Sequence, residues 1–247
     1  AVYLDPRPQT ADELLKALKE WLRKLTRGDA PTAHGDLPAG GAPRRSSSRP
    51  AITADDLDAL PQAPMNPGKN SEALNKWADE VAAAHPGLSK DEVLAAYDYS
   101  TSNYRNINGW LRDSSRPVSP QVPKTVDDLN SLLDKLPSHE GTVYRGTEIP
   151  TETLEQAVKS GVYSDPAFLS SSTDGGVARS FMQSGYPDAG STKVLFEIDG
   201  HSGSSIQRMS QIQHEAEVLF KSGTKFDILD YRIDPSTGNY FIRMAEQ

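Results

Sequence analysis

The hydrophobic pattern of this chain changes its period once, close to Pro137, and this change limits the folds that the sequence can adopt. Before Pro137, apolar residues recur at helical spacing, and Ser89 with Glu92 forms a capping box that starts one of the helices. After it, short apolar runs such as 193–198 and 225–233 are separated by turn residues, which is typical of strands. A block of helices followed by a block of strands predicts an α+β domain with a mainly antiparallel sheet.

The N-terminal part of the chain differs in composition from the rest. Residues 11–25 follow a capping box and carry apolar side chains at helical spacing, which predicts an amphipathic helix that needs a partner surface, either the main domain or another protein. Across 27–68, prolines fall among Gly, Ser and Ala with one short interruption near 52–60, which predicts an extended or disordered linker. We therefore expect residues 1–69 to form a helix plus a linker, and residues 70–247 to form the compact domain.

Composition excludes several classes of function. The chain has no cysteine, which rules out thiol catalysis, disulfides and cysteine-ligated zinc. A formal net charge of -8 argues against a general nucleic-acid or membrane-surface binder. The five histidines form no recognisable metal motif, so we expect no metal site. No apolar run is long enough to span a bilayer, and the N-terminus lacks the apolar core of a signal peptide.

Three polar clusters fall at predicted strand positions in the second half of the chain. They are Arg145, the serines 170–172, and the pair Glu215 and Glu217, which would project from one face of a strand. An arginine beside a glycine can bind a phosphate, a serine can orient a carboxylate, and a carboxylate can stabilise an oxocarbenium-like sugar. Each cluster also has an ordinary structural interpretation, as a surface ion pair, a strand-end cap or a solvated strand face.

The order of these clusters resembles the R-S-E class of mono-ADP-ribosyltransferases, in its Glu-x-Glu, arginine-specific type. The similarity covers residues 70–247 and includes Asn103–Arg112 (NYRNINGWLR), which is similar to the helix and loop beneath the nicotinamide pocket of that family. The resemblance implies an ADP-ribosyltransferase fold, in which N-terminal helices precede a mainly antiparallel, two-sheet β core around an NAD cleft. Residues 70–247 would then be the catalytic domain.

The resemblance also implies a role for each motif residue. Arg145 would bind the NAD diphosphate, Ser170 would aim the catalytic Glu217 at the 2'-hydroxyl of the nicotinamide ribose, and Glu215 would serve the acceptor. The stretch 182–190 would form the phosphate–nicotinamide loop. The residues implied to surround NAD are Tyr97, Asn108, Arg112, Tyr144, Arg145, Gly146, Ser170, Ser171, Ser172, Phe181, Tyr186 and Glu217.

The function implied by the resemblance is transfer of ADP-ribose from NAD to an arginine of a target protein, with release of nicotinamide and without a metal. The chain would act as a bacterial toxin or effector, secreted or delivered into a target cell, with an immunity or chaperone protein as a further partner. Residues 202–213 would meet the target protein. This loop holds Ile206, Met209 and Ile212 but lacks the aromatic residue common in the family, so the sequence leaves the target open.

Two other functions are compatible with the same residues. The fold could work as an NAD glycohydrolase, or could modify an acceptor other than arginine. The chain could instead be a non-catalytic binding module that docks a partner through the helix at 11–25. Substitution of Glu215 distinguishes the first alternative from arginine transfer, and substitution of Glu217 distinguishes the second.

Overall fold

The computed structural model describes residues 51–68, 71–184 and 187–247, so the predicted helix at 11–25 and most of the predicted linker lie outside the described residues. The described helices are α2 (Ala54–Ala59), α3 (Glu72–Ala84), α4 (Lys90–Asp98), α5 (Tyr104–Arg112), α6 (Gln121–Lys135), α7 (Thr151–Ser160) and α8 (Gly175–Gln183). A π-helical turn, η1 (Tyr99–Asn103), joins α4 to α5, and two 3-10 turns, η2 (Gln207–Met209) and η3 (Gln213–Glu215), follow later. The strands are β1 (Gly141–Pro150), β2 (Val162–Ser164), β3 (Leu169–Ser172), β4 (Ser191–Gly200), β5 (Ser204–Ser205), β6 (Glu217–Phe220), β7 (Lys225–Ile233) and β8 (Tyr240–Glu246).

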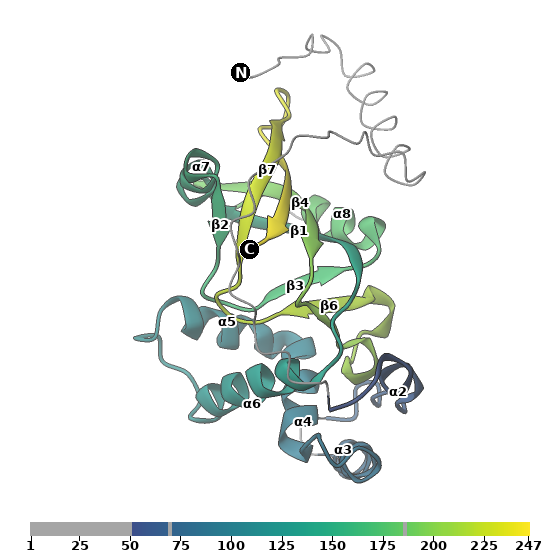
Figure 1. The fold of residues 1–247 in the computed structure, drawn as a ribbon. Helices are drawn as coiled ribbons and strands as arrows, with labels where there is room; N and C mark the ends of the chain where they lie inside the picture. Colours follow the sequence, from purple (N-terminus) through teal and green to yellow (C-terminus); the bar gives the residue numbers. More distant parts are fainter. Residues whose placement is uncertain (1–50, 69–70, 185–186) are drawn as a thin grey trace. The chain divides into compact units, whose positions relative to one another are not determined.

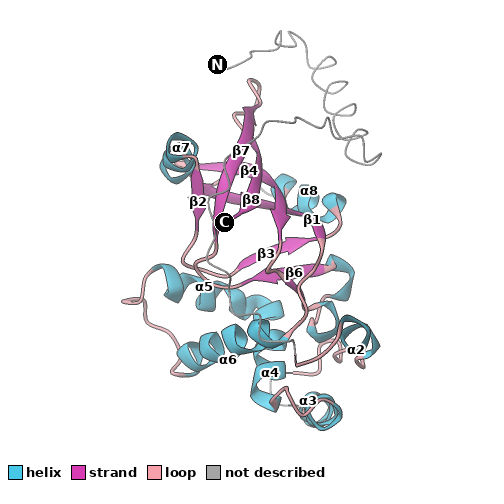
Figure 2. Cartoon of the chain, in the orientation of Figure 1, coloured by secondary structure: helices cyan, strands magenta, loops and turns pink. Residues whose placement is uncertain are grey.

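The helices α2 to α6 gather on one side of the strands, and α7 and α8 flank the sheet (Figures 1 and 2). The predicted capping box starts α4, where the side chain of Ser89 accepts from the backbone N–H of Glu92 and the Glu92 carboxylate accepts from the N–H of Ser89. Gly161 ends α7 in the left-handed region at φ 75°, where glycine is favoured. None of the described helices combines the length and the apolar character needed to cross a bilayer.

The eight strands form one sheet in the order β2-β7-β8-β4-β1-β3-β6-β5. All neighbouring strands run antiparallel except β4 and β8. The strands β1 and β3 meet through a single register pair, Tyr144 opposite Ser172, which divides the sheet into a five-strand part and a three-strand part. The α+β class is therefore as predicted, while the expected two sheets are two parts of one continuous sheet.

Two apolar cores pack against the sheet. Buried side chains of β1, β4 and β8 pack together with α7, and they include Phe196 and Leu154. On the other side, Phe168 and Leu219 join the core of the helical layer. Two of the largest packing partners of that layer are Trp77 on α3 and Leu129 on α6. Strand β6 contributes buried side chains to both cores, so the three-strand part of the sheet lies between them.

Residues 51–68 pack as part of the domain, which differs from the predicted linker. Ile52, Leu57, Leu60 and Ala63 are all buried in the same cluster as the helical layer. The short helix α2 begins with a capping box between Thr53 and Asp56, a signal that is present in the sequence. The packed part of the chain therefore begins before residue 70.

Candidate active site

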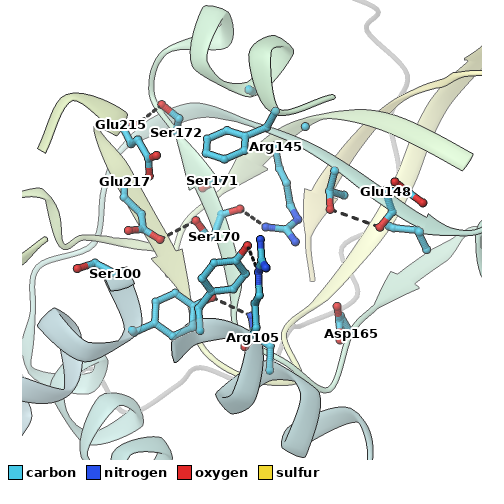
Figure 3. Close-up of a pocket in the computed structure, with 18 of the residues that line it drawn as sticks. Ser100, Arg105, Arg145, Glu148, Asp165, Ser170, Ser171, Ser172, Glu215 and Glu217 are labelled. Carbon is cyan, nitrogen blue, oxygen red and sulfur yellow. Dashed lines mark hydrogen bonds between the residues drawn. The ribbon is translucent and has the colours of Figure 1, made fainter. Parts of the chain in front are cut away.

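A cavity of about 1160 Å³ opens between the helical layer and the sheet. Its walls come from η1, α5, β1, β3, α8 and the segment from Gln211 to Glu217. The three polar clusters from the second half of the sequence all line it (Figure 3). The fold thus gathers side chains that are about 70 positions apart in sequence into one site.

Ser170 connects Arg145 and the carboxylate of Glu217. Its hydroxyl donates to Oε1 of Glu217 at 2.6 Å, and its carbonyl accepts from Nη1 of Arg145 at 2.6 Å. The register of β3 and β6 explains the first contact, because Ser170 lies opposite Leu219 and therefore shares a face with the diagonal neighbour Glu217. Figure 3 shows Ser170 between Arg145 and Glu217.

The other two serines hold the backbone of the segment that carries the glutamates. The hydroxyl of Ser171 donates to the carbonyl of Val218 at 2.7 Å, and that of Ser172 donates to the carbonyl of Glu215 at 2.6 Å. Both serines are buried. They therefore position the carboxylates through the backbone and do not present hydroxyls to a ligand in this arrangement.

Glu215 and Glu217 both line the cavity, but not for the predicted reason. The strand β6 begins only at Glu217, and Glu215 ends the 3-10 turn η3. Between them Ala216 adopts φ 46° and ψ 50°, a left-handed conformation that costs a non-glycine residue about 1 kcal/mol. A kink in the backbone therefore brings the two carboxylates to one cavity, where the sequence predicted strand alternation.

Burial controls the ionisation of both glutamates. Burial and, to a lesser extent, the nearby Glu215 carboxylate raise the pKa of Glu217, the Ser170 hydroxyl and Arg145 lower it, and the net pKa is about 7. Burial also raises the pKa of Glu215 above its ordinary value, with His214 opposing it. A carboxyl whose pKa is perturbed inside a cavity is typical of an active site.

The helical wall of the cavity is formed by Tyr99 and Asn108, and not by Tyr97. Nδ2 of Asn108 donates to the hydroxyl of Tyr99 at 3.0 Å. Tyr97 is buried against Trp77 in the helical core, with ring centroids 6.3 Å apart, and is not among the cavity-lining residues. The prediction that Tyr97 contacts the ligand therefore differs from the structure, because the π-helical turn changes the phase of the helix after Asp98.

Arg112 lies at the cavity and is held by Asp165. Its guanidinium donates to both carboxylate oxygens, with the shortest distance 2.6 Å from Nη2 to Oδ2. Burial opposes ionisation of Asp165, but the hydrogen bonds from Arg112 hold the pKa of this carboxyl below its ordinary value. The ion pair therefore fixes the Arg112 guanidinium at the wall of the cavity.

Two buried polar atoms at the cavity lack a hydrogen-bond partner among the described residues. They are Nε of Arg145, a donor, and Oδ1 of Asn108, an acceptor. Buried polar atoms are rarely left unsatisfied, so these two mark places where a ligand can bind. An anionic group would accept from Arg145, and a group with an N–H or O–H would donate to Asn108. A ligand that carries both phosphates and amide or hydroxyl groups fits this pair.

Residues 70–245 match the family model described as ADP-ribosyltransferase exoenzyme. The chain belongs to this family. The match covers the helical layer from α3 onward and the whole sheet, so the cavity lies within the family domain.

Several relatives of this chain are named as arginine ADP-ribosyltransferases. Mav from Mycobacterium avium (strain 104), provisionally named an NAD(+)–arginine ADP-ribosyltransferase, is 36% identical over 180 residues, which are 73% of this chain and 21% of Mav. The NAD(+)–protein-arginine ADP-ribosyltransferase Tre1 from Serratia proteamaculans (strain 568) is 32% identical over 144 residues, 58% of this chain and 29% of Tre1. The chain thus spans less than a third of the length of either relative.

A solved structure of similar fold has been described with a small ligand. It is the ADP-ribosyltransferase Vis, from Vibrio splendidus, in complex with agmatine. The TM-score is 0.58 at 27% identity, and the alignment covers 74% of this chain and 88% of that chain. The ADP-ribosyltransferase fold predicted from the sequence is therefore confirmed.

Most of the residues that the resemblance assigned to NAD line the exoenzyme cavity. Tyr144, Gly146 and Phe181 do so in addition to those described above, while Tyr186 lies outside the described residues. Polar lining residues that the sequence did not assign individually include Tyr99, Arg105, Asp165 and Gln211. Arg105 lies within the NYRNINGWLR motif and Gln211 within the predicted target loop, but no local pattern marks Asp165. In the described part of the chain no three His, Asp or Glu side chains are grouped as a metal site requires, and a metal-free reaction stays a prediction.

Proposed function

We propose that this exoenzyme transfers ADP-ribose from NAD to an arginine side chain of a target protein and releases nicotinamide. The observation that carries the proposal is the hydrogen bond from Ser170 to Glu217, in a cavity that also holds Arg145 and Glu215. The printed names of Mav and Tre1 and the agmatine complex of Vis support an arginine-like acceptor, since agmatine carries the guanidinium group of arginine.

Arg145 binds the diphosphate of NAD in this proposal. Its Nη1 is engaged by the carbonyl of Ser170, and its buried Nε is free of protein partners among the described residues. A guanidinium group held in this way can donate to a phosphate oxygen in a fixed direction. Because the same Ser170 also holds Glu217, binding of the diphosphate places the nicotinamide ribose beside the carboxylate.

Glu217 stabilises the ribose while the glycosidic bond breaks. The bond between C1' and the nicotinamide nitrogen cleaves, nicotinamide leaves as a neutral molecule with the bonding electrons, and positive charge develops on the ribose. A carboxylate that accepts a hydrogen bond from the 2'-hydroxyl stabilises this charge, and it is most effective where water is excluded. Glu217 is only 6% exposed, so it satisfies this condition.

Glu215 serves the acceptor. A guanidinium group has a pKa above about 12 and is a poor nucleophile until a carboxylate orients it and removes a proton. One of its nitrogens then bonds to C1', and the proton passes to Glu215. The kink at Ala216 brings this second carboxylate to the same cavity as Glu217, which supports a separate role for each.

We also propose that the protein acts as a toxin or effector that is secreted or delivered into a target cell. The family description, exoenzyme, supports action outside the producing cell. Its partners in this proposal are NAD and a target protein that presents an arginine.

The test is incubation of the protein with NAD labelled in the adenylate part, with and without agmatine. We expect nicotinamide release in both samples and labelled agmatine in the second. Absence of nicotinamide release would overturn the proposal. If nicotinamide is released but neither agmatine nor arginine side chains in a cell lysate are labelled, the protein is a glycohydrolase or uses a different acceptor.

A further inference from the structure

Residues 61–66, which we call the strap, run beside the loop that carries the acceptor glutamate. The backbone of Ala63 bonds to this loop on both sides. Its N–H donates to the carbonyl of Arg208 at 2.9 Å, and its carbonyl accepts from Nε2 of Gln213 at 3.1 Å. The strap therefore bridges the 3-10 turns η2 and η3, the second of which ends at Glu215.

A third contact lies next to the cavity. Nε2 of Gln211 donates to Oδ1 of Asn66. The backbone N–H of Gln211 also donates to the hydroxyl of Ser100 at 2.8 Å. Because Gln211 and Ile212 line the cavity, the strap acts on residues that a bound acceptor would meet.

The strap is itself fixed to the helical layer. Nε1 of Trp77 donates to the carbonyl of Pro61 at 2.9 Å. Ala63 is only 3% exposed and shares the apolar core of that layer with Ile206 and Met209 of the loop. The strap and the loop therefore pack against the same core, and the hydrogen bonds from the strap hold the loop in place.

The loop contains no long helix or strand. Between β5 and β6 it has two short 3-10 turns and the left-handed Ala216, and its internal backbone hydrogen bonds each span only three residues. Each residue of an unsupported loop loses about 1 kcal/mol or more of conformational entropy when it is fixed for reaction. A loop that is held in advance avoids this cost at the moment when the acceptor binds.

The strap lies outside the family domain, since the family model begins at residue 70. The family model therefore does not include the residues of the strap. The contacts of the strap explain why residues 51–68 pack although their composition predicts a linker.

We infer that the strap is a positioning element for the acceptor step. By fixing Gln211 and the turn that ends at Glu215, it sets the affinity for a guanidine acceptor and the partition between transfer and hydrolysis of NAD. The inference rests on the proposed function. It deepens that function by assigning acceptor selection to residues that contact neither NAD nor the reacting atoms.

The test uses the full chain and the substitution Asn66→Gly. Asn66 has φ 48°, where glycine is unstrained, so this change removes the side-chain acceptor without opposing the backbone conformation. We expect the KM for agmatine to rise about three- to tenfold, as for loss of one hydrogen bond, while NAD hydrolysis without acceptor stays within about twofold. Gln213→Ala, which removes the contact to Ala63, should shift the KM in the same direction.

Met65→Ala is the matched control. This neighbouring side chain is 75% exposed and does not line the cavity, so both activities should match those of the wild type. Equal loss of transfer and hydrolysis in the Asn66 and Gln213 variants, or no change in either, would overturn the inference. A wild-type protein that does not modify agmatine or a protein arginine would overturn the proposed function instead, which keeps the two failures distinct.

Discussion

The hydroxyl of Ser170 lies 2.6 Å from Oε1 of Glu217 and donates to it. Glu217 lines the cavity but is almost entirely screened from solvent. A hydrogen bond to a buried carboxylate favours its ionised form, because little water is present to compete. Ser170 therefore does two things at once, since it orients the carboxylate and counteracts the effect of burial on its pKa.

The activity should depend on pH through Glu217. Burial raises the pKa of this carboxyl to about 7, and only the ionised form can stabilise the positively charged ribose. We expect kcat/KM for NAD to fall about tenfold for each unit of pH below about 7 and to level off above it. Initial rates of nicotinamide release between pH 5 and 9 measure this, with circular dichroism at each pH to show that the protein stays folded. A flat profile down to pH 5 would contradict the assignment.

Ser170→Ala should move this profile to higher pH and lower its plateau. The substitution removes a hydrogen bond that lowers the pKa of Glu217, so protonation of the carboxyl will begin at a higher pH than in the wild type. Loss of orientation should reduce the plateau about 10- to 100-fold. Ser180→Ala, on the exposed face of α8, is the control and should leave the profile unchanged. A lower plateau with an unshifted pH midpoint would argue for a merely structural serine.

Glu217→Gln should make the protein inactive and more stable at high pH. Between the ordinary pKa of 4.5 and about 7, the folded state holds a proton that the unfolded state has released, so the burial of Glu217 costs stability as pH rises through this window. Above pH 7 the full cost applies, on the order of 3 kcal/mol. Glutamine removes it and can still accept from Ser170.

The measurement is thermal unfolding of wild type and Glu217→Gln at pH 5 and pH 8. We expect a rise in Tm of roughly 5–10 °C at pH 8 and a much smaller one at pH 5. Glu155→Gln, an exposed change on α7, should show no such difference. The same shift at both pH values would show that ionisation of Glu217 is not its cause.

Local signals in the sequence were sufficient for the order of elements and for much of the site. The capping box of Ser89 and Glu92 and the helix stop at Gly161 each act within a few residues, so their effect can be predicted without tertiary contacts. The family order of Arg145, Ser170 and Glu217 likewise predicted a cluster that the fold brings together.

What could not be predicted depends on contacts between distant segments. Nothing in the sequence marks Ala216 as left-handed, because this conformation is imposed by the turn η3 and the bond from Thr173 to its carbonyl. The choice of Tyr99 over Tyr97 depends on a π-helical turn that has no periodic signature. Residues 51–68 have a linker composition, and only their contacts with the loop at 207–213 and the helical core fix them.

Gly146→Ala should destabilise the domain and weaken NAD binding. A Cβ at this position would lie 1.7 Å from the carbonyl oxygen of Ala178 and 2.8 Å from the amide nitrogen of Met182, so α8 would have to move away from β1. Overpacking of this kind costs about 1–3 kcal/mol, and the movement would displace Phe181 from the cavity. Gly175→Ala is the control on the same helix, since its Cβ would meet Tyr144 at an ordinary 3.5 Å. A Gly146→Ala protein with the Tm and KM of the wild type would contradict this packing.

Glu215→Gln should separate transfer from hydrolysis. Glu217 keeps its hydrogen bond to Ser170 in this variant, so cleavage of NAD should survive within about threefold. Removal of the neighbouring negative charge even favours ionisation of Glu217, because Glu215 raises the pKa of that carboxyl. The acceptor loses the carboxylate that orients it and takes its proton, so transfer to agmatine should fall by about 100-fold or more. Nicotinamide release and labelled agmatine, measured in the same reaction, give both rates. If the two fall together, Glu215 is not the residue that serves the acceptor, and the two carboxylates act as one unit in breaking the bond to nicotinamide.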